Sequence, residues 1–305
     1  MWQQVKKKVE IAKQKKKEKE ERQKLVEKKK QPAAFFSIPL LNVSLQEVDF
    51  KLEPLFYPHV KYPASPSPIS NYNEYFEDSV IKKFSNSKWR QMKHFIKKCV
   101  SDENLLIERN KFKLTVVDIK TLAGTHWVND QIINFYFKLI EERNLNSTYL
   151  PDIFAFSSFF FGSLKQHGYE GVKRETKNID IFKYSIIFIP VFELNHWTLI
   201  IVDFGECKII SYDSIGGKNI DNTKEMIKYM KQEYLEKKKE KKSFDYLAFE
   251  YVTCPHQTNS YDCGVFISYF AKCYGMLKSP SFVQKELKLI RTMMTYEILN
   301  SQILE

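Results

Sequence analysis

The chain has 305 residues, of which 43% are hydrophobic and 15% aromatic. This composition can bury an extended core, so it excludes a wholly disordered chain. The five cysteines show no CxxC spacing, which argues against a disulfide scaffold or a zinc knuckle and favours a reducing compartment. No apolar run approaches the roughly 18 residues of a membrane span, and more charge follows the first lysines, so neither a span nor a signal peptide is expected.

The positive charge is concentrated at the N-terminus. Residues 1–30 hold twelve lysines, one arginine and five glutamates, a net charge of +8 out of +11 for the whole chain. The pattern predicts a basic charged tail that is helical or disordered. Its functional alternatives are a nuclear import signal or a nucleic-acid contact. Nucleic acid is the weaker candidate, because aromatic residues are not interleaved with the lysine runs.

Proline marks the next segment. Seven of the eleven prolines fall in residues 31–75, which predicts a linker or extended arm. From residue 76 to residue 305 the pattern is that of a folded domain.

The first element that the sequence predicts in the folded domain is a helix. Asn129 or Asp130 is a plausible N-cap for an apolar pattern of helical spacing that ends near residues 141–144. Three β-rich runs follow, at residues 185–192, 197–204 and 208–212, and Gly205-Glu206 predicts a hairpin between the last two. The mostly apolar residues 264–276 predict a buried helix. Together these elements predict an α+β fold.

The predicted hairpin brings a histidine close to a carboxylate. If Gly205-Glu206 is its tip, paired residues have numbers that sum to about 411, so His196 lies opposite Ser214 or Ile215. Asp213 is within two residues of that position on the neighbouring strand. A carboxylate in that place can fix the tautomer of the imidazole and stabilise the imidazolium. A surface polar pair is the alternative interpretation.

Cys263 stands where a polar stretch meets the apolar helix. A thiol at a helix N-terminus lies at the positive end of the helix dipole, which stabilises the thiolate. The alternative is an inert buried cysteine, and that is the interpretation of Cys99, Cys207, Cys254 and Cys273.

Gln257 lies six residues before Cys263. Its amide can donate to a developing oxyanion, together with the backbone N–H of Cys263. A glutamine that only bonds its own loop is the alternative. The neighbouring His256 is a weaker candidate base than His196, because no carboxylate is predicted to pair with it. A single cysteine with separated His, Asp and amide partners predicts nucleophilic catalysis.

Several segments in this order resemble the SUMO-specific cysteine proteases, also called ubiquitin-like-protein or sentrin-specific proteases. The segments are Trp127–Tyr136, Gly171–Arg174, His196-Trp197, Tyr212–Gly217 and Pro255–Gln257 through Asp262–Gly264. The resemblance implies a papain-like-superfamily cysteine protease domain in residues 76–305, with a central, mostly antiparallel sheet flanked by helices.

The resemblance also implies roles for single residues. Cys263 matches the nucleophile, His196 the general base, Asp213 the orienting carboxylate and Gln257 the oxyanion donor. No metal and no organic cofactor is implied. The implied reaction cleaves the bond after the C-terminal Gly-Gly of the modifier, either to trim a precursor or to release the modifier from a target lysine.

Three further residues are implied to contact the substrate. Trp127 and Trp197 match the two tryptophans that line the narrow passage for the Gly-Gly tail. Asp130 is a candidate contact with the modifier, although helix capping explains it equally well. Glu175, His256 and Tyr261 depart from the usual family pattern, but none of these departures removes a catalytic group.

The expected partners are SUMO or a related ubiquitin-like protein and its conjugates, with nuclear import factors as candidates for the basic tail. The expected location is the nucleus, with the cytoplasm as the alternative. The alternative functions are a protease for another ubiquitin-like modifier and a non-catalytic scaffold that binds a modifier or nucleic acid.

Overall fold

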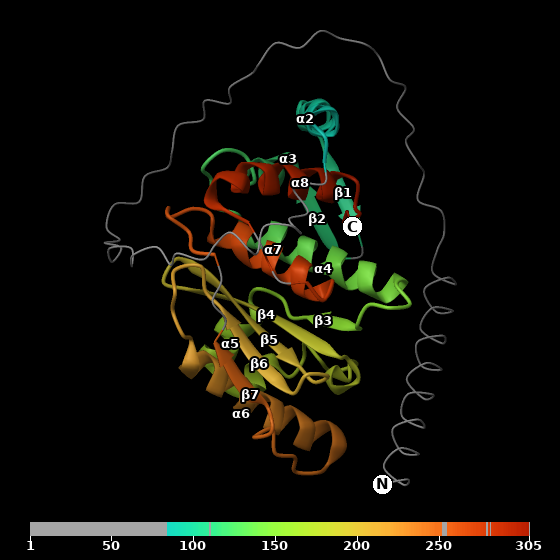
Figure 1. Cartoon of the computed structure of the whole chain (residues 1–305). Coiled ribbons are helices and arrows are strands. Elements are labelled where there is room, and N and C mark those ends of the chain that lie inside the picture. Colours follow the sequence, from blue (N-terminus) through green and yellow to red (C-terminus); the bar gives the residue numbers. More distant parts are fainter. Residues whose placement is uncertain (1–83, 110, 252–254, 279, 281, 305) are drawn as a thin grey trace. The chain divides into compact units, whose positions relative to one another are not determined.

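The structure is a computed structural model of the chain, and it describes residues 84–109, 111–251, 255–278, 280 and 282–304 (Figure 1). The predicted basic tail at 1–30 and the predicted linker at 31–75 lie outside the described residues. In the part that is described, no helix is long and apolar enough to cross a bilayer.

Seven α-helices and seven strands make up the described fold. The helices are α2 (Asn86–Val100), α3 (Val116–Lys120), α4 (Asp130–Asn146), α5 (Phe160–Val172), α6 (Ile220–Lys238), α7 (Cys263–Gly275) and α8 (Leu287–Leu299). The strands are β1 (Leu106–Arg109), β2 (Phe112–Thr115), β3 (Ile153–Ala155), β4 (Ile186–Glu193), β5 (His196–Asp203), β6 (Lys208–Tyr212) and β7 (Ala248–Tyr251). Short 3₁₀ turns lie at Ile181–Lys183 and Gln284–Glu286.

The main sheet has five strands in the order β3-β4-β5-β6-β7. Strands β4, β5 and β6 lie where the sequence predicts them and pair antiparallel. Most of the residue pairing in the sheet is therefore antiparallel, as predicted, and only the short edge strands are parallel: β3 pairs with β4 and β7 pairs with β6. The sheet is therefore mixed, within the α+β class that was predicted.

The parallel edges follow from the connections. A parallel pair needs a crossover rather than a tight turn, and α5 connects β3 to β4 while α6 connects β6 to β7. Both edge strands are short, at three and four residues. Runs of that length carry too little periodicity to be recognised in the sequence.

Helices cover both faces of this sheet (Figure 1). Helices α4 and α7 pack on one face of the sheet, and α8 packs on the side of these two helices that is away from the sheet. Helices α5 and α6 lie on the other face. Alternate residues of β5 divide between two hydrophobic cores: Leu199 and Ile201 face α4 and α7, and Ile200 and Val202 face α5 and α6. Because α7 packs on β5, the fold sets the position of Cys263, which begins α7, relative to His196, which begins β5.

A tight turn joins β4 to β5 directly before His196. Glu193 pairs with His196, so only Leu194 and Asn195 form the loop. Both have a positive φ, +50° and +60°, which suits the right-handed twist of a two-residue hairpin. The turn places His196 in the first position of β5.

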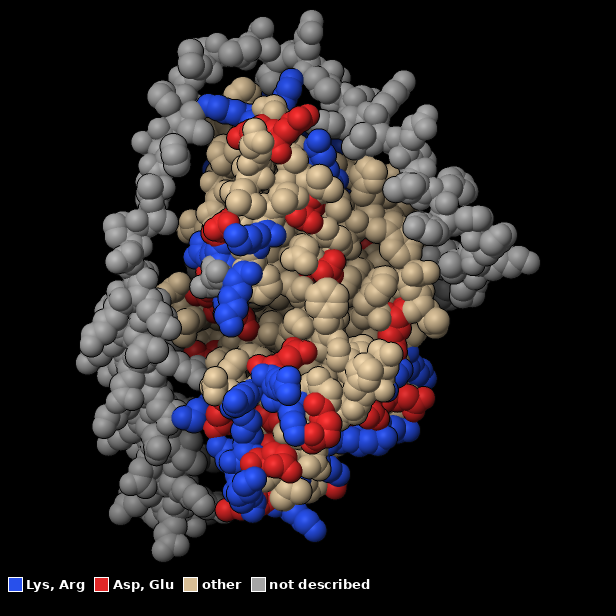
Figure 2. Space-filling model, turned by 180° about the vertical axis from the view of Figure 1, so that it is seen from behind, with Lys and Arg blue, Asp and Glu red and all other residues tan. Residues whose placement is uncertain are grey.

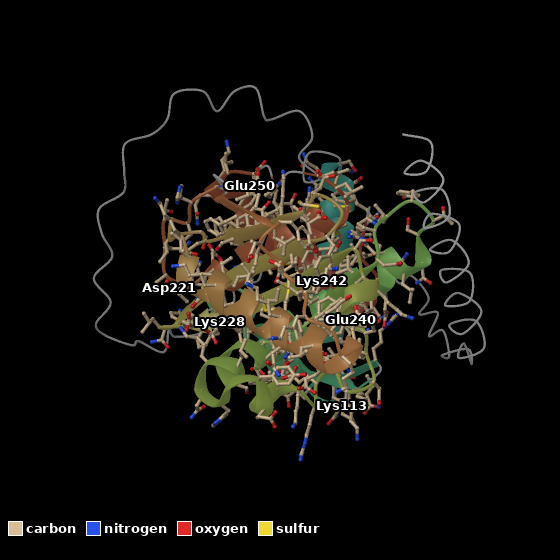
Figure 3. All side chains as sticks on the ribbon, turned by 90° about the horizontal axis from the view of Figure 1, so that it is seen from below. Lys113, Asp221, Lys228, Glu240, Lys242 and Glu250 are labelled. Carbon is tan, nitrogen blue, oxygen red and sulfur yellow. The ribbon has the colours of Figure 1, made fainter. Side chains whose placement is uncertain are left out.

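The charged surface around α6 has mixed sign. Basic and acidic side chains intermingle over the lower part of the view in Figure 2. Ion pairs join Lys224 to Asp221 and Lys228 to Glu225 along the helix, and Figure 3 labels Asp221 and Lys228 among the side chains of this region. The lysine run that begins at Lys237 is at the end of α6. Such a surface resembles an ordinary solvated helix face more than a nucleic-acid site.

Candidate active site

Cys263 is the first residue of α7 and its side chain is buried, with 2% exposed. The sequence predicts this position. Backbone N–H groups at a helix start lack partners within the helix and, together with the helix dipole, favour a negative charge there. The fold therefore places a sulfur atom where an anion is stabilised.

Gly264 allows α7 to begin very close to its neighbours. A Cβ atom at this position would lie 2.9 Å from Cβ of Val128 and 3.3 Å from Cδ1 of Trp197. Any larger residue would push the start of α7 away from the Trp197 ring. Gly264 thus allows Cys263, the residue before it, to lie close to Val128 and Trp197.

His196 and Asp213 meet as the predicted register requires. Leu199 pairs with Tyr212, so paired numbers sum to 411 as expected. His196 Nε2 lies 2.6 Å from Asp213 Oδ1, and both side chains are largely buried. The same carboxylate oxygen accepts from the backbone N–H of Ile215 at 3.0 Å. The carboxylate is thereby held in place to orient the imidazole.

Gly217 lets the chain turn around that carboxylate. A Cβ atom at Gly217 would lie 2.2 Å from Asp213 Oδ2, so a side chain there is excluded unless the carboxylate moves. The local sequence after β6 is in this way suited to a buried carboxylate next to His196.

The Cys263 thiol is the second hydrogen-bond neighbour of His196. Burial lowers this pKa, but hydrogen bonds to Asp213 and Cys263, together with the charges of both groups, raise it to about 9. Because Nε2 faces Asp213, Nδ1 is the ring nitrogen left for the thiol. At neutral pH the raised pKa favours the imidazolium form of His196 beside the Cys263 sulfur.

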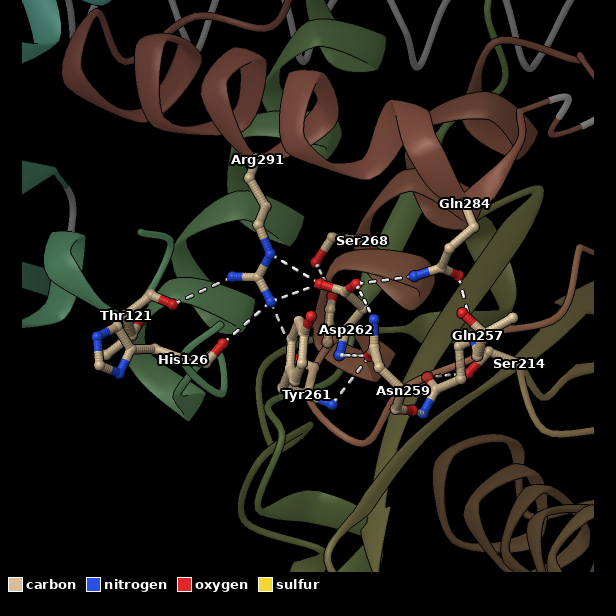
Figure 4. Close-up of polar contacts among 12 residues, drawn as sticks. Thr121, His126, Ser214, Gln257, Asn259, Tyr261, Asp262, Ser268, Gln284 and Arg291 are labelled. Carbon is tan, nitrogen blue, oxygen red and sulfur yellow. Dashed lines mark hydrogen bonds and ion pairs between the residues drawn. The ribbon is translucent and has the colours of Figure 1, made fainter. Parts of the chain in front are cut away.

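Gln257 lies beside the end of β6 rather than free in its loop (Figure 4). Its Oε1 accepts from Ser214 Oγ at 2.8 Å, its backbone N–H donates to Ser214 O at 2.8 Å, and its Nε2 donates to Asn259 O at 2.8 Å. Among the described residues, one N–H of the amide therefore has an acceptor in Asn259 O, and the second N–H is the one proposed for a developing oxyanion. That role stays a prediction.

The two tryptophans differ in burial but share a neighbour. Trp197 is 5% exposed and its indole N–H donates to Val128 O at 3.3 Å. Trp127 directly precedes Val128 and is 39% exposed. Trp197 thus packs in the core beside Gly264 and also supports the backbone that presents Trp127. Contact of either ring with a substrate tail stays a prediction.

Asp130 is the first residue of α4, and Asn129 is the N-cap. The side chain of Asn129 accepts from the backbone N–H of Ile132 at 3.0 Å, as expected for one of the two capping candidates. Asp130 accepts from Gln131 Nε2 at 3.1 Å, and its charge suits the first turn of a helix. Its contact with a modifier stays a prediction.

His256, the weaker candidate base, is exposed and lies against Gly216.

The remaining cysteines are only partly as expected. Cys273 is buried, and burial raises its pKa to about 11, which is consistent with an inert thiol. Burial also raises the pKa of Cys99, which is partly exposed. Cys207 is exposed, contrary to the prediction of a buried residue, because it lies in the β5–β6 turn at a positive φ of +56°. Cys254 lies outside the described residues.

Sequence reasoning missed the partner of Asp262. The carboxylate directly before Cys263 forms a buried ion pair with Arg291 of α8 at 2.7 Å (Figure 4). Asp262 itself stands in a recognised motif, but no local pattern connects it with an arginine 29 residues along the chain. Only the packing of α8 against α7 brings the two together.

Comparison with known proteins gives a consistent result. The model of the Ulp1 protease family, C-terminal catalytic domain, matches residues 126–303. A sentrin-specific protease of Caenorhabditis elegans is 38% identical over 188 residues, which cover 61% of this chain and 27% of that protein. Human sentrin-specific protease 2 is 34% identical over 209 residues, or 66% of this chain and 35% of that protein. The chain thus matches about a third of the length of these relatives.

Solved structures share the fold. The C-terminal Ulp1 protease domain in complex with Smt3, the yeast ortholog of SUMO, aligns with a TM-score of 0.62 at 27% identity. The alignment covers 73% of this chain and 99% of that domain. Ulp1 with its catalytic cysteine oxidised to a sulfenic acid aligns with a TM-score of 0.61, also at 27% identity, over 73% of this chain and 98% of the other.

Proposed function

Because the chain belongs to the Ulp1 protease family of cysteine proteases, we propose that it hydrolyses the bond after the C-terminal Gly-Gly of SUMO. The bond is a peptide bond in a precursor or an isopeptide bond to a target lysine. The observation that carries the proposal is the meeting of Cys263, His196 and Asp213 at the start of α7.

The first half of the reaction is acyl transfer to sulfur. The Cys263 thiolate attacks the carbonyl carbon of the terminal glycine, and the carbonyl oxygen becomes an oxyanion. The backbone N–H of Cys263 and the second amide N–H of Gln257 donate to that oxygen. The imidazolium of His196 gives its proton to the departing amine as the C–N bond breaks, which leaves a thioester on Cys263.

The second half releases the modifier. His196 is now neutral, so it takes a proton from a water molecule that attacks the thioester. The C–S bond breaks, the modifier leaves with a free carboxylate, and the thiolate and imidazolium are restored. Asp213 keeps one tautomer of the ring throughout, since its carboxylate stays bonded to Nε2.

The named relatives favour SUMO as the modifier, and the tryptophans favour a glycine tail. The relatives that match are named sentrin-specific proteases, and the Ulp1 domain of similar fold was solved with Smt3 bound. Trp197 lies beside Gly264, and a passage between flat indole rings would suit the glycine tail of any ubiquitin-like modifier, because residues without side chains can pass where others are excluded. Trp127 and Trp197 are the rings proposed for that contact.

A panel of activity probes tests both the nucleophile and the modifier. Each probe carries one ubiquitin-like protein with an electrophile at its C-terminus, and intact-mass measurement detects covalent capture. We expect capture by the SUMO probe at Cys263 and none in the Cys263→Ser variant, which keeps its noncovalent affinity for SUMO. Capture of another modifier alone would replace SUMO in the proposal, and no capture at all would favour a non-catalytic scaffold.

For the basic residues 1–30 we propose a role in nuclear location through import factors. The support is the net charge of +8 in this segment. Fluorescence imaging of the tagged full chain and of a chain without residues 1–30 tests it. We expect the full chain in the nucleus and the shortened chain in both compartments, while equal distributions would contradict the proposal.

A further inference from the structure

A buried ion pair lies directly beside the nucleophile. Asp262 precedes Cys263 and is 3% exposed, and Arg291 on α8 is 5% exposed. Arg291 Nε lies 2.8 Å and Nη2 lies 2.7 Å from Asp262 Oδ1 (Figure 4). A buried charge pair of this kind persists only when its remaining polar atoms also find partners.

The rest of the guanidinium holds the two segments that flank the site. Nη2 donates to Tyr261 O at 2.9 Å, in the loop that leads to Cys263, and to His126 O at 3.0 Å, directly before Trp127. Nη1 donates to Thr121 O at 3.3 Å, at the end of α3. One side chain from α8 therefore fixes the chain before the nucleophile against the chain before Trp127.

The carboxylate of Asp262 is fully engaged as well. Its Oδ2 accepts from Asn259 Nδ2 at 2.7 Å and from Gln284 Nε2 at 3.2 Å. Its side chain does not cap α7, although it occupies the N-cap position. The backbone N–H groups at the start of α7, beside the sulfur, are thus not bonded by the Asp262 side chain. Asn259, which donates to Asp262, in turn accepts a hydrogen bond from the Gln257 amide.

Arg291 balances the charge of the carboxylate that directly precedes the sulfur-bearing residue. The charged and titratable groups near the start of α7 include His196 from β5 with Asp213 behind it, Tyr261 and Asp262 in the preceding loop, and Arg291 from α8, whose guanidinium lies over the Tyr261 ring. A carboxylate one residue away opposes a thiolate unless a cation balances it. Arg291 supplies that cation.

We propose that Arg291 is a positioning residue of the catalytic site, which neutralises Asp262 and fixes Cys263 relative to His196 and to the Trp127 segment. The proposal rests on the proposed protease function. Arg291 is assigned no contact with the reacting atoms and acts through the two loops that it binds.

Three variants separate this role from plain structural support. Arg291→Gln removes both the charge and the fork of donors, whereas Arg291→Lys keeps the charge and loses the fork. Lys272→Gln is the matched control, because Lys272 and Glu297 form a second buried ion pair between α7 and α8, at 2.5 Å. Each variant is measured for melting temperature, for the pH dependence of Cys263 alkylation by iodoacetamide, and for kcat and KM on a fluorogenic SUMO C-terminal amide.

Arg291→Gln is expected to raise the midpoint of Cys263 alkylation by about one pH unit, because Asp262 is left unbalanced. Its kcat is expected to fall by about tenfold to a hundredfold, more than KM rises, since small displacements of reacting groups cost that much. Arg291→Lys should keep the wild-type midpoint but show a kcat at least about fivefold lower. Lys272→Gln should lose melting temperature while its midpoint and kcat stay close to wild type.

An Arg291→Gln variant that matches Lys272→Gln in midpoint and kcat would overturn the proposal, because support alone would then explain the ion pair. If Arg291→Gln does not fold, Arg291→Lys decides, and a wild-type kcat there would overturn the proposal too. An unreactive Cys263 in the wild-type chain is a different result, which would refute the protease function itself and this proposal with it.

Discussion

Replacing Asp213 by Asn removes the carboxylate charge beside His196, and the new side chain has a shape similar to that of Asp213. The pKa of His196 is about 9 against an ordinary value of 6.5, so its surroundings favour the imidazolium by about 3 kcal/mol. Burial acts in the opposite direction, so the bonds and charges of Asp213 and Cys263 supply this preference. Without the carboxylate, the pKa of His196 is expected to fall toward its ordinary value.

The direction of the pH effect follows from a raised pKa. In the wild-type chain His196 is charged below about pH 9, and the contribution of this charge to stability is lost as the pH rises through about 9. That contribution is complete below about pH 6.5. In Asp213→Asn the loss moves to lower pH. If the pKa falls to about 6.5, about 3% of His196 stays protonated at pH 8, so turnover should slow by about 30-fold.

Rates of SUMO amide hydrolysis between pH 5.5 and pH 10 measure this change. The alkaline limb should move toward neutral pH in Asp213→Asn and stay in place in His256→Gln, a control that alters an exposed histidine outside the catalytic pair. A rate profile of Asp213→Asn with the wild-type alkaline limb would refute the reasoning, because another group would then hold the imidazolium.

Three further substitutions test the neighbours of the nucleophile. Gly264→Ala should lower the free energy of unfolding by about 1–3 kcal/mol, because the new Cβ atom would lie 2.9 Å from Cβ of Val128; chemical denaturation measures it, and unchanged stability would mean that the start of α7 can shift freely. Gln257→Ala should lower kcat by about a hundredfold or more if the amide binds the oxyanion, and an unchanged kcat with normal folding would limit Gln257 to its bonds with Ser214 and Asn259. Trp197→Ala should lower both stability, by about 3–5 kcal/mol in thermal unfolding, and selectivity for glycine in substrates altered at the last residue; loss of stability alone would make the ring a core residue only.

The residues that local sequence could predict are those whose partners are near in the chain. The antiparallel register follows from the position of the β5–β6 turn, so the meeting of His196 and Asp213 could be worked out by counting from Gly205-Glu206. The position of Cys263 at a helix start follows from the change from polar to apolar residues. In both cases the determining pattern spans fewer than about twenty residues.

The residues that local sequence could not predict depend on packing between distant segments. Strands β3 and β7 are too short to show a period, and each is completed by a neighbour beyond a crossover helix. Arg291 lies on a helix whose sequence gives no sign of the loops it binds. The family resemblance supplied the roles of Trp127 and Trp197, and their burial came only from the fold.

The position of Arg291 also bears on when the site becomes complete during synthesis. The ribosome releases the strands with His196 and Asp213 first, then the loop with Cys263, and only later α8. Until α8 docks, the carboxylate beside the sulfur has no counter-charge and the segment before Trp127 has no anchor. A nascent chain should therefore cleave its substrate more slowly than the finished protein until the last helix of the described domain has packed.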